Sequence, residues 1–289
     1  MRYREPLFRP PGEAGSLILQ VAYGCPHNSC RFCGMYKGVP YEEREEGELF
    51  AEIREAGKRY PETNRIFLAD GDCLYLPGEK LLQILTALQE AFPRLARVGS
   101  YSNGSSILKN RSFLPALKAA KLDTLYMGLE SGSEEVLRLF GKGETPEEMV
   151  EGVQLAQEAS LRCSVMILLG LGGKKYHREH IEKTAEILVK MQPRLLSSLR
   201  FIPMPFLKLP AGFEEISEYE SVEELYEIFA LAGGKLKTVF RSDHISSPVP
   251  LSGRLPQDRD YFLRVLGNLL ASSRLDKNNP APKPPFFQL

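Results

Sequence analysis

Three cysteines within nine residues are the strongest chemical feature of this sequence. Cys25, Cys30 and Cys33 have the spacing C-x4-C-x2-C and are three of the five cysteines in the chain. Thiolates that converge from one loop suit a soft metal, and iron–sulfur clusters are held by such groups. Because no fourth cysteine lies nearby, a four-iron cluster here would have one iron without a protein ligand. An iron with an open position can bind and activate a small molecule, so the loop is a candidate reaction centre.

Two other chemistries fit the same loop. With His27 as a fourth ligand, the three cysteines could close a tetrahedral zinc site in a structural or nucleic-acid-binding module. Alternatively, the loop could hold an iron–sulfur cluster that serves only electron transfer or partner contact. His27 could equally shape the loop without binding a metal.

Composition places the chain among ordinary globular proteins. Its 289 residues suit one α/β barrel or two small domains, with 43% apolar and 26% charged residues and a formal net charge of zero. The neutral balance does not favour an electrostatic grip on nucleic acid. We find neither a signal-peptide core nor a run of about 18 apolar residues, so we expect a cytoplasmic protein. Thiols stay reduced there, which favours metal binding over disulfides.

The elements that must position these residues alternate along the chain. Six strand-like runs are predicted at Leu17–Tyr23, Arg65–Ala69, Arg97–Ser102, Thr124–Leu129, Ser164–Leu169 and Leu195–Ile202. Apolar residues at helical spacing lie between them, and Thr145 with Pro146 and Glu148 has the signature of a helix start. Such an order implies parallel strands with helical crossovers. Periodicity alone fits both a partial (β/α)6 barrel and an open doubly wound sheet.

After residue 202 the pattern loosens. Helices are expected at Val222–Leu231 and near Gln257–Ala271. A proline-rich tail from about Asn278 is expected to be extended or disordered.

Polar or glycine-rich segments follow several predicted strands. Besides the cysteine loop, they are Asp70–Cys73, Ser102–Gly104, Gly128–Ser133 and Gly170–Gly173. In parallel α/β folds, ligands gather at the carboxyl ends of strands. These loops are therefore expected to share one rim.

The cysteine loop, the turn Asp70-Gly71-Asp72 and the segment Gly128–Gly132 together resemble the radical S-adenosylmethionine (SAM) superfamily. The resemblance spans roughly residues 16–205 and is closest to the branch that includes Elp3-, MiaB- and NifB-like enzymes. It implies an α/β fold, a partial (β/α)6 TIM-like barrel of parallel strands in residues 1–205. Residues 206–289 would form a C-terminal extension that closes the barrel. The first gap of the cysteine motif is one residue longer than the usual C-x3-C-x2-C.

The resemblance also implies the reaction. Cys25, Cys30 and Cys33 would bind a [4Fe-4S] cluster whose open iron is chelated by SAM. The reduced, oxygen-sensitive cluster would cleave SAM to methionine and a 5′-deoxyadenosyl radical, which abstracts hydrogen from an unidentified substrate. A small-molecule substrate is favoured and tRNA stays open. The implied electron donor is a protein such as flavodoxin or ferredoxin, and no membrane is involved.

The remaining residues that the resemblance assigns would all contact SAM or the substrate. Phe32 would pack near the adenine. Asp70, Gly71 and Asp72 would hold the SAM amino group, and Glu130 its polar groups. Gly170 and Gly172 would let the backbone approach the adenosine, and Arg200 would bind a carboxylate.

Each of these assignments has a structural alternative. Glu130 could instead help Ser131 and Ser133 to cap the next helix, and Arg200 could form a surface salt bridge. The Asp-Gly-Asp and glycine-rich segments could be ordinary turns, and Phe32 could fill the core.

Four further residues could take part in chemistry. Cys73 could donate a hydrogen atom to a radical, although a single cysteine is most often a small buried apolar residue. His177 and His180 could pair on a metal, but we expect them at the surface. Tyr126 is a candidate substrate contact.

Overall fold

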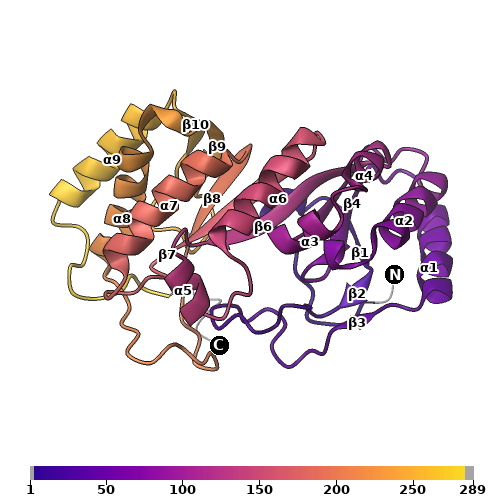
Figure 1. Ribbon diagram of the computed structural model, residues 1–289, viewed down its shortest axis with the longest axis horizontal. Coiled ribbons are helices and arrows are strands. Elements are labelled where there is room, and N and C mark those ends of the chain that lie inside the picture. The colour runs from indigo at the N-terminus through magenta and orange to yellow at the C-terminus, as the bar shows by residue number, and fades with distance from the viewer. Residues whose placement is uncertain (1–2, 284–289) are drawn as a thin grey trace. The chain divides into compact units, whose positions relative to one another are not determined.

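Strands and helices alternate along residues 3–283, the part of the chain that the computed structural model describes. The chain forms two compact units. The first contains residues 3–28, 35–127 and 151–163, and the second contains residues 29–34, 128–150 and 164–283. Figure 1 labels the elements of both.

Parallel strands form the sheet of the first unit. In order they are β1 (Leu17–Gln20), β4 (Arg65–Ala69), β5 (Arg97–Tyr101) and the first part of β6 (Leu122–Glu130). Their registers align the last residues of β1 and β4, so both strands end at the same edge. β4 is buried along four of its five residues, as expected for a parallel strand covered on both faces.

Helices cover this sheet. They are α1 (Glu46–Arg59), α2 (Gly78–Ala91), α3 (Gly104–Lys109), α4 (Leu114–Ala119) and most of α6 (Pro146–Glu158), with the short helices η1 (Pro11–Glu13) and η2 (Cys73–Tyr75). α1 packs against α2 at a close approach, because a Cβ at Gly57 would lie 2.3 Å from the carbonyl oxygen of Ala91. The predicted start of α6 is confirmed. The Glu148 amide donates to Thr145 Oγ1 at 3.2 Å, and the Thr145 amide donates to the Glu148 carboxylate at 2.8 Å.

The second unit continues the strand-and-helix order. Its strands are β7 (Arg162–Leu169), which begins in the first unit, β8 (Leu195–Arg200), β9 (Thr238–Arg241) and β10 (Ser252–Leu255). β7, β8 and β9 are parallel, and β10 is antiparallel to β9. The helices are α5 (Glu134–Leu139), α7 (His177–Met191), α8 (Glu218–Ala232) and α9 (Arg259–Ala271), with η3 (Gly233–Lys235).

α7 packs on α8 and α8 packs on α9 (Figure 1). Three buried rings, Phe229, Phe240 and Phe262, join α8, β9 and α9. The C-terminal segment is therefore part of this unit's core.

The six predicted strands are confirmed, with two differences. The first run ends as β1 at Gln20, and Ala22–Tyr23 forms β2, which pairs with β3 (Glu42–Glu43). β9 and β10 were not predicted, because their short sequences lack a long apolar run. No ladder among the described residues joins β10 back to β1, so the α/β fold is an open, partial barrel of mostly parallel strands.

Over residues 3–283, no helix is long and apolar enough to cross a membrane. The proline-rich tail is irregular from residue 278 to 283, and its remainder lies outside the described residues.

Candidate functional site

The cysteine loop begins directly after β2, and protein groups hold its two ends together within the first unit. Gly24 has a φ of +73°, and a Cβ there would lie 3.0 Å from the carbonyl oxygen of Val39. The side-chain amide of Asn28 donates to Tyr36 O at 2.6 Å and to Val39 O at 3.2 Å. The first cysteine therefore lies in a loop that the protein itself closes.

Asp70, at the end of β4, anchors this loop. Its carboxylate accepts hydrogen bonds from Gln20 Nε2 and the Gly24 amide, each at 3.1 Å, and from the Tyr36 hydroxyl at 3.2 Å. Burial raises the pKa of Asp70 to about 6, although these three hydrogen bonds act in the opposite direction. The structure gives Asp70 a role in fixing the loop, and its contact with the SAM amino group stays a prediction.

The next two residues pack directly against the loop. A Cβ at Gly71 would lie 2.5 Å from Cys25 Cβ and 2.8 Å from its Sγ. Asp72 Oδ2 accepts a hydrogen bond from Ser106 Oγ at 2.6 Å and lies 3.1 Å from His27 Nε2. The Asp-Gly-Asp turn thus fixes the position of the first cysteine and of His27.

Two residues considered for chemistry lie inside the first unit. Cys73 is only 1% exposed, its thiol lies 3.2 Å from Leu68 O, and burial raises its pKa. The Tyr126 hydroxyl donates to the buried Glu13 carboxylate at 2.7 Å. Both environments favour packing roles. Hydrogen donation by Cys73 stays a prediction.

In the second unit, the Cys30 segment is tied to the residues that follow α5. The Arg31 amide donates to Phe140 O at 2.6 Å, and Ser29 Oγ donates to Gly141 O at 3.0 Å. The side chain of Lys142 lies in this region and is 6% exposed.

Lys142 places a buried positive charge near Cys30. Burial acts to lower the pKa of Lys142, but the charges of Glu144, Glu130 and Cys30 outweigh it and raise the pKa. A protonated lysine favours a neighbouring thiolate, which is the form that binds iron.

Glu130 ends β6 in a left-handed conformation with a φ of +65°. A Cβ at Gly128 would lie 1.7 Å from Glu130 Oε1, so the glycine makes room for the carboxyl group. Burial raises the pKa of Glu130 to about 7, with Lys142 opposing that shift. Ser133, and not Glu130, caps α5, because its Oγ accepts a hydrogen bond from the Val136 amide.

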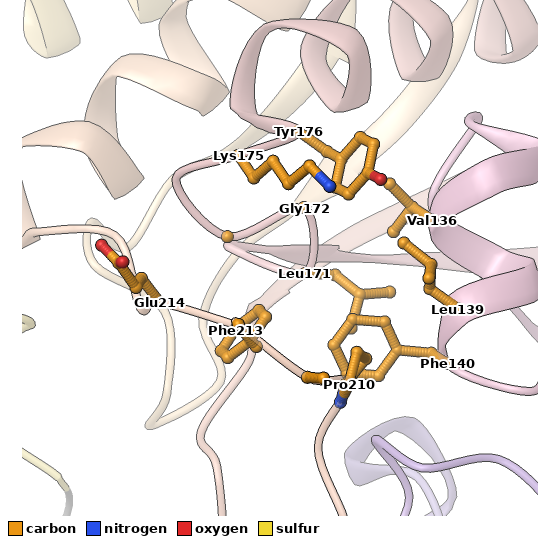
Figure 2. Close-up of a pocket in the computed structure, with 13 residues that line it drawn as sticks. Val136, Leu139, Phe140, Leu171, Gly172, Lys175, Tyr176, Pro210, Phe213 and Glu214 are labelled. Atoms are coloured by element: carbon orange, nitrogen blue, oxygen red, sulfur yellow. The ribbon is translucent and has the colours of Figure 1, made fainter.

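Phe32 packs against an apolar cluster of the second unit, with its ring centroid 6.2 Å from that of Phe140. A small pocket of about 50 Å³ borders the same cluster. Figure 2 shows the rings of Phe140 and Phe213 on one side of it and the side chains of Lys175 and Tyr176 on the other. This volume admits a few water molecules and is far below that of a nucleoside site.

The glycine-rich turn after β7 is held from α7 and α8. Gly170, with a φ of +86°, donates its amide to Glu224 Oε2 at 2.6 Å. A Cβ at Gly172 would lie 2.8 Å from His180 Cβ. The expectation that His177 and His180 lie at the surface was wrong for His180, and His177 is only partly exposed. Their side chains are 18% and 0% exposed, because α8 covers this part of α7.

Arg200, at the end of β8, holds the C-terminal tail. Its Nη1 donates to Ala281 O at 2.5 Å and its Nη2 to Pro282 O at 2.8 Å. Burial lowers the pKa of Arg200. Binding of a SAM or substrate carboxylate by Arg200 stays a prediction.

The cysteines fit an iron–sulfur cluster by their chemistry. All three are half-buried and none forms a disulfide. Cys25 belongs to the first unit, whereas Cys30 and Cys33 belong to the second. Among residues 3–283, no three His, Cys, Asp or Glu side chains lie close enough together to hold one metal ion. A cluster takes its thiolates on separate iron atoms and does not require such a group.

Comparison with known proteins identifies the class. The family model of the radical SAM superfamily matches residues 19–188. This chain belongs to the radical SAM superfamily, which uses a [4Fe-4S] cluster and SAM.

Individual relatives are distant. The chain is 24% identical over 230 residues to the anaerobic magnesium-protoporphyrin IX monomethyl ester cyclase of Cereibacter sphaeroides, covering 76% of this chain and 36% of the cyclase. Coproporphyrinogen III oxidase (HemN) from Escherichia coli has a similar fold, with a TM-score of 0.57 and 20% identity over 75% of this chain and 52% of that one. Methylornithine synthase (PylB) gives a TM-score of 0.52 at 15% identity, covering 92% of this chain and 83% of that one.

The chain spans 46%, 36% and 32% of the length of three curated relatives. The sequence similarity therefore concerns only part of each of these three relatives.

Sequence reasoning missed several residues around these loops. They are Gln20, Tyr36, Ser106, Lys142, Glu144 and Glu224. Most lie outside the predicted rim loops, and their roles depend on contacts between distant segments. Lys142 and Glu144 lie between α5 and the helix start at Thr145, and no local pattern in the sequence marks them as buried.

Proposed function

We propose that this protein is a radical SAM enzyme that acts on a small-molecule substrate. The observation that supports it best is the cysteine loop, in which three half-buried thiols outside any disulfide follow β2 in a chain that belongs to this superfamily. Cys25, Cys30 and Cys33 would hold the [4Fe-4S] cluster. With SAM bound, the reduced cluster would supply a 5′-deoxyadenosyl radical for hydrogen abstraction from the substrate.

The chain's own residues would prepare the cluster site. Gly71 leaves room for Cys25. Asp70 fixes the loop on both sides of the cysteines, by its hydrogen bonds with the Gly24 amide and the Tyr36 hydroxyl. Lys142 would stabilise the Cys30 thiolate. These groups orient the ligands before the cluster is assembled.

Other residues would bind SAM. Gly170 and Gly172 would allow the backbone to approach the adenosine, and Phe32 would pack near its adenine. Glu130, whose pKa of about 7 keeps it partly protonated at neutral pH, could exchange hydrogen bonds with polar groups of SAM. Asp72, with Asp70 and Gly71, would receive the SAM amino group, and Arg200 a carboxylate.

The neutral net charge favours a small molecule over tRNA as substrate. The cysteines must stay reduced to bind a cluster, which suits the cytoplasm. A protein such as flavodoxin or ferredoxin would donate the electron that reduces the cluster. A cluster with an open iron is expected to be oxygen-sensitive.

The decisive experiment measures 5′-deoxyadenosine after anaerobic reconstitution with iron and sulfide, using dithionite and SAM. Wild type is expected to form it, whereas the Cys25→Ala, Cys30→Ala, Cys33→Ala triple variant is expected to form none. Cys163→Ala is the matched control, because this cysteine is buried with its thiol against Val153 O and should leave the product unchanged. A colourless protein with stoichiometric zinc would support the zinc module instead. An iron-loaded wild type that binds SAM without cleaving it would support a cluster-binding protein.

A further inference from the structure

A buried histidine lies between two of the loops that are proposed to bind SAM. His180 Nδ1 is 2.8 Å from Ser131 Oγ, in the loop after β6. The His180 Cβ lies 2.8 Å from where a Cβ would stand on Gly172, in the loop after β7. The side chain of His180 is 0% exposed. It therefore ties both loops to α7 from within the second unit.

A buried carboxylate on α8 completes this network. Glu224, also 0% exposed, accepts the Gly170 amide at 2.6 Å. Its Oε1 is 3.1 Å from His177 Nδ1, within hydrogen-bond distance, whereas its Oε2 lies 3.8 Å from His180 Nε2, a packing contact without a hydrogen bond. A buried carboxylate with these partners connects the C-terminal extension to the turn after β7.

The loop after β6 is fixed by the same helix at a second point. The Gly132 amide donates to Thr184 Oγ1 at 3.0 Å, and a Cβ at Gly132 would lie 2.2 Å from Lys183 O. Neither loop can shift far without breaking contacts to α7 or α8.

The charged groups that face this network come from both helices. Besides Glu224, α8 supplies Glu223, whose carboxylate lies 3.4 Å from His177 Nε2, and Glu220, whose charge acts on His177. α7 supplies Glu179, whose carboxylate accepts a hydrogen bond from Ser133 Oγ at 2.6 Å. Burial acts to lower the His177 pKa, but the hydrogen bonds and charges of Glu224, Glu223 and Glu220 together outweigh it and raise the pKa. Glu224 therefore accepts a hydrogen bond from the Gly170 amide and lies within hydrogen-bond distance of His177.

We propose that Glu224 is a positioning residue for SAM: by its hydrogen bond with the Gly170 amide and by packing against His180, it holds the loops 130–133 and 170–173 in the conformation that binds the cofactor. This inference rests on the proposed function, because the two loops are assigned to SAM there. It makes the C-terminal extension a determinant of SAM affinity, although α8 itself does not contact the cofactor.

The test compares the SAM dissociation constant of three variants of the cluster-loaded protein by equilibrium dialysis. Glu224→Leu removes the acceptor and leaves the Gly170 amide buried without it, so the dissociation constant should rise about tenfold or more. Glu224→Gln retains an acceptor and should recover most of the affinity. Glu223→Leu, the same change one residue away at a side chain that is 37% exposed, should stay within about twofold of wild type.

Hydrogen exchange provides a readout that needs neither SAM nor turnover. Peptides that contain residues 130–133 and 170–173 should exchange faster in Glu224→Leu than in wild type, and Glu223→Leu should exchange as wild type does. Wild-type affinity in folded Glu224→Leu, or an equal loss in Glu223→Leu, would overturn the proposal. If Glu224→Leu does not fold, Glu224→Gln with unchanged exchange but at least tenfold weaker binding would also contradict it.

The two levels of inference fail differently. A wild-type protein that carries its cluster but binds no SAM overturns the proposed function. Unchanged exchange of both loops in Glu224→Leu would overturn the positioning role whatever the wild type binds.

Discussion

At the scale of single residues, several glycines owe their place to a neighbouring functional side chain. Gly71 lies against Cys25, and Gly128 lies against the Glu130 carboxyl group. In each case a methyl group would occupy the space of the reactive group. These two glycines act by leaving space for the side chains of Cys25 and Glu130.

Gly71→Ala is expected to disturb the first cysteine. The new Cβ would lie 2.5 Å from Cys25 Cβ, and both neighbours belong to backbone-anchored segments that cannot easily yield. We expect a loss of about 1–3 kcal/mol in stability and a reconstituted iron content below half of the wild-type value. Iron and sulfide per chain, measured after anaerobic reconstitution, check this.

Gly15→Ala is the matched control, because nothing lies within 4 Å of a Cβ at that position. It should retain the wild-type iron content. If Gly71→Ala also retains it, the contact with Cys25 does not constrain cluster assembly.

At the scale of elements, close helix packing and charged strand ends hold the first unit together. α1 approaches α2 where only a glycine fits. The starts of β6 and β7 carry Asp123 and Arg162, which form an ion pair with each other. Both features can be tested by single substitutions.

Gly57→Ala should destabilise the protein although alanine favours helices. The helical gain is about 1 kcal/mol, whereas a Cβ 2.3 Å from Ala91 O forces α1 and α2 apart at a cost that exceeds it. We expect a net loss of about 1–2 kcal/mol in urea unfolding.

Gly267→Ala, in α9, is the control for helix propensity, because its Cβ would meet only Tyr226 at an ordinary 3.5 Å. It should stabilise the protein by about 0.5–1 kcal/mol. Stabilisation by Gly57→Ala would show that α1 and α2 can separate without penalty.

Asp123 is expected to make stability depend on acid pH. Burial alone would raise its pKa, but hydrogen bonds from Arg162, Lys118 and Thr124 outweigh burial and lower the pKa to about 2, from 3.8. A lowered acid pKa gives stability that is present above pH 3.8 and is lost as the pH falls towards 2. Since Arg162 is 44% exposed, the contribution is roughly 1 kcal/mol.

The free energy of unfolding of Asp123→Asn should therefore be lower than that of wild type at pH 7. The difference between the two should shrink as the pH falls towards about 2.5. Asp260→Asn serves as control, because its side chain is 91% exposed. A difference that persists unchanged at low pH would assign the effect to packing.

At the scale of the whole molecule, the C-terminal segment completes the second unit. β9 pairs with β8, and α8 covers α7, with Phe229 and Phe240 buried in the resulting core. The boundary at residue 205 that the sequence suggested separates elements that share a hydrophobic core.

A fragment of residues 1–205 should consequently fail to fold cooperatively. Loss of α8 would expose the buried face of α7 to water and leave β8 with an unpaired edge. We expect poor solubility and no sigmoidal urea transition by circular dichroism, in contrast with the full chain. A fragment that unfolds cooperatively would show that residues 1–205 form an independent domain.

The fold class could be predicted because it depends on local patterns. Apolar runs such as Arg65–Ala69 and the helix start at Thr145 specify strands and helices from a few neighbouring residues. β9 and β10 escaped prediction because strands of four residues leave little periodic signal and form through pairing with distant partners. The buried position of His180 and the half-buried position of His177 escaped it because α8, which covers them, lies about 40 residues further along the chain.

The sequence by itself determined the chemistry that is available: the three spaced cysteines, the order of strands and helices, and the loops at strand ends. These follow from spacing and residue type, which act over short stretches of chain. Only the tertiary structure decided how the loops are held. Asp70 fixes the cysteine loop, Gly71 makes room for Cys25, and Glu224 reaches the Gly170 amide. Such contacts join residues about 45 to 55 positions apart, and their energies depend on burial that no local pattern encodes.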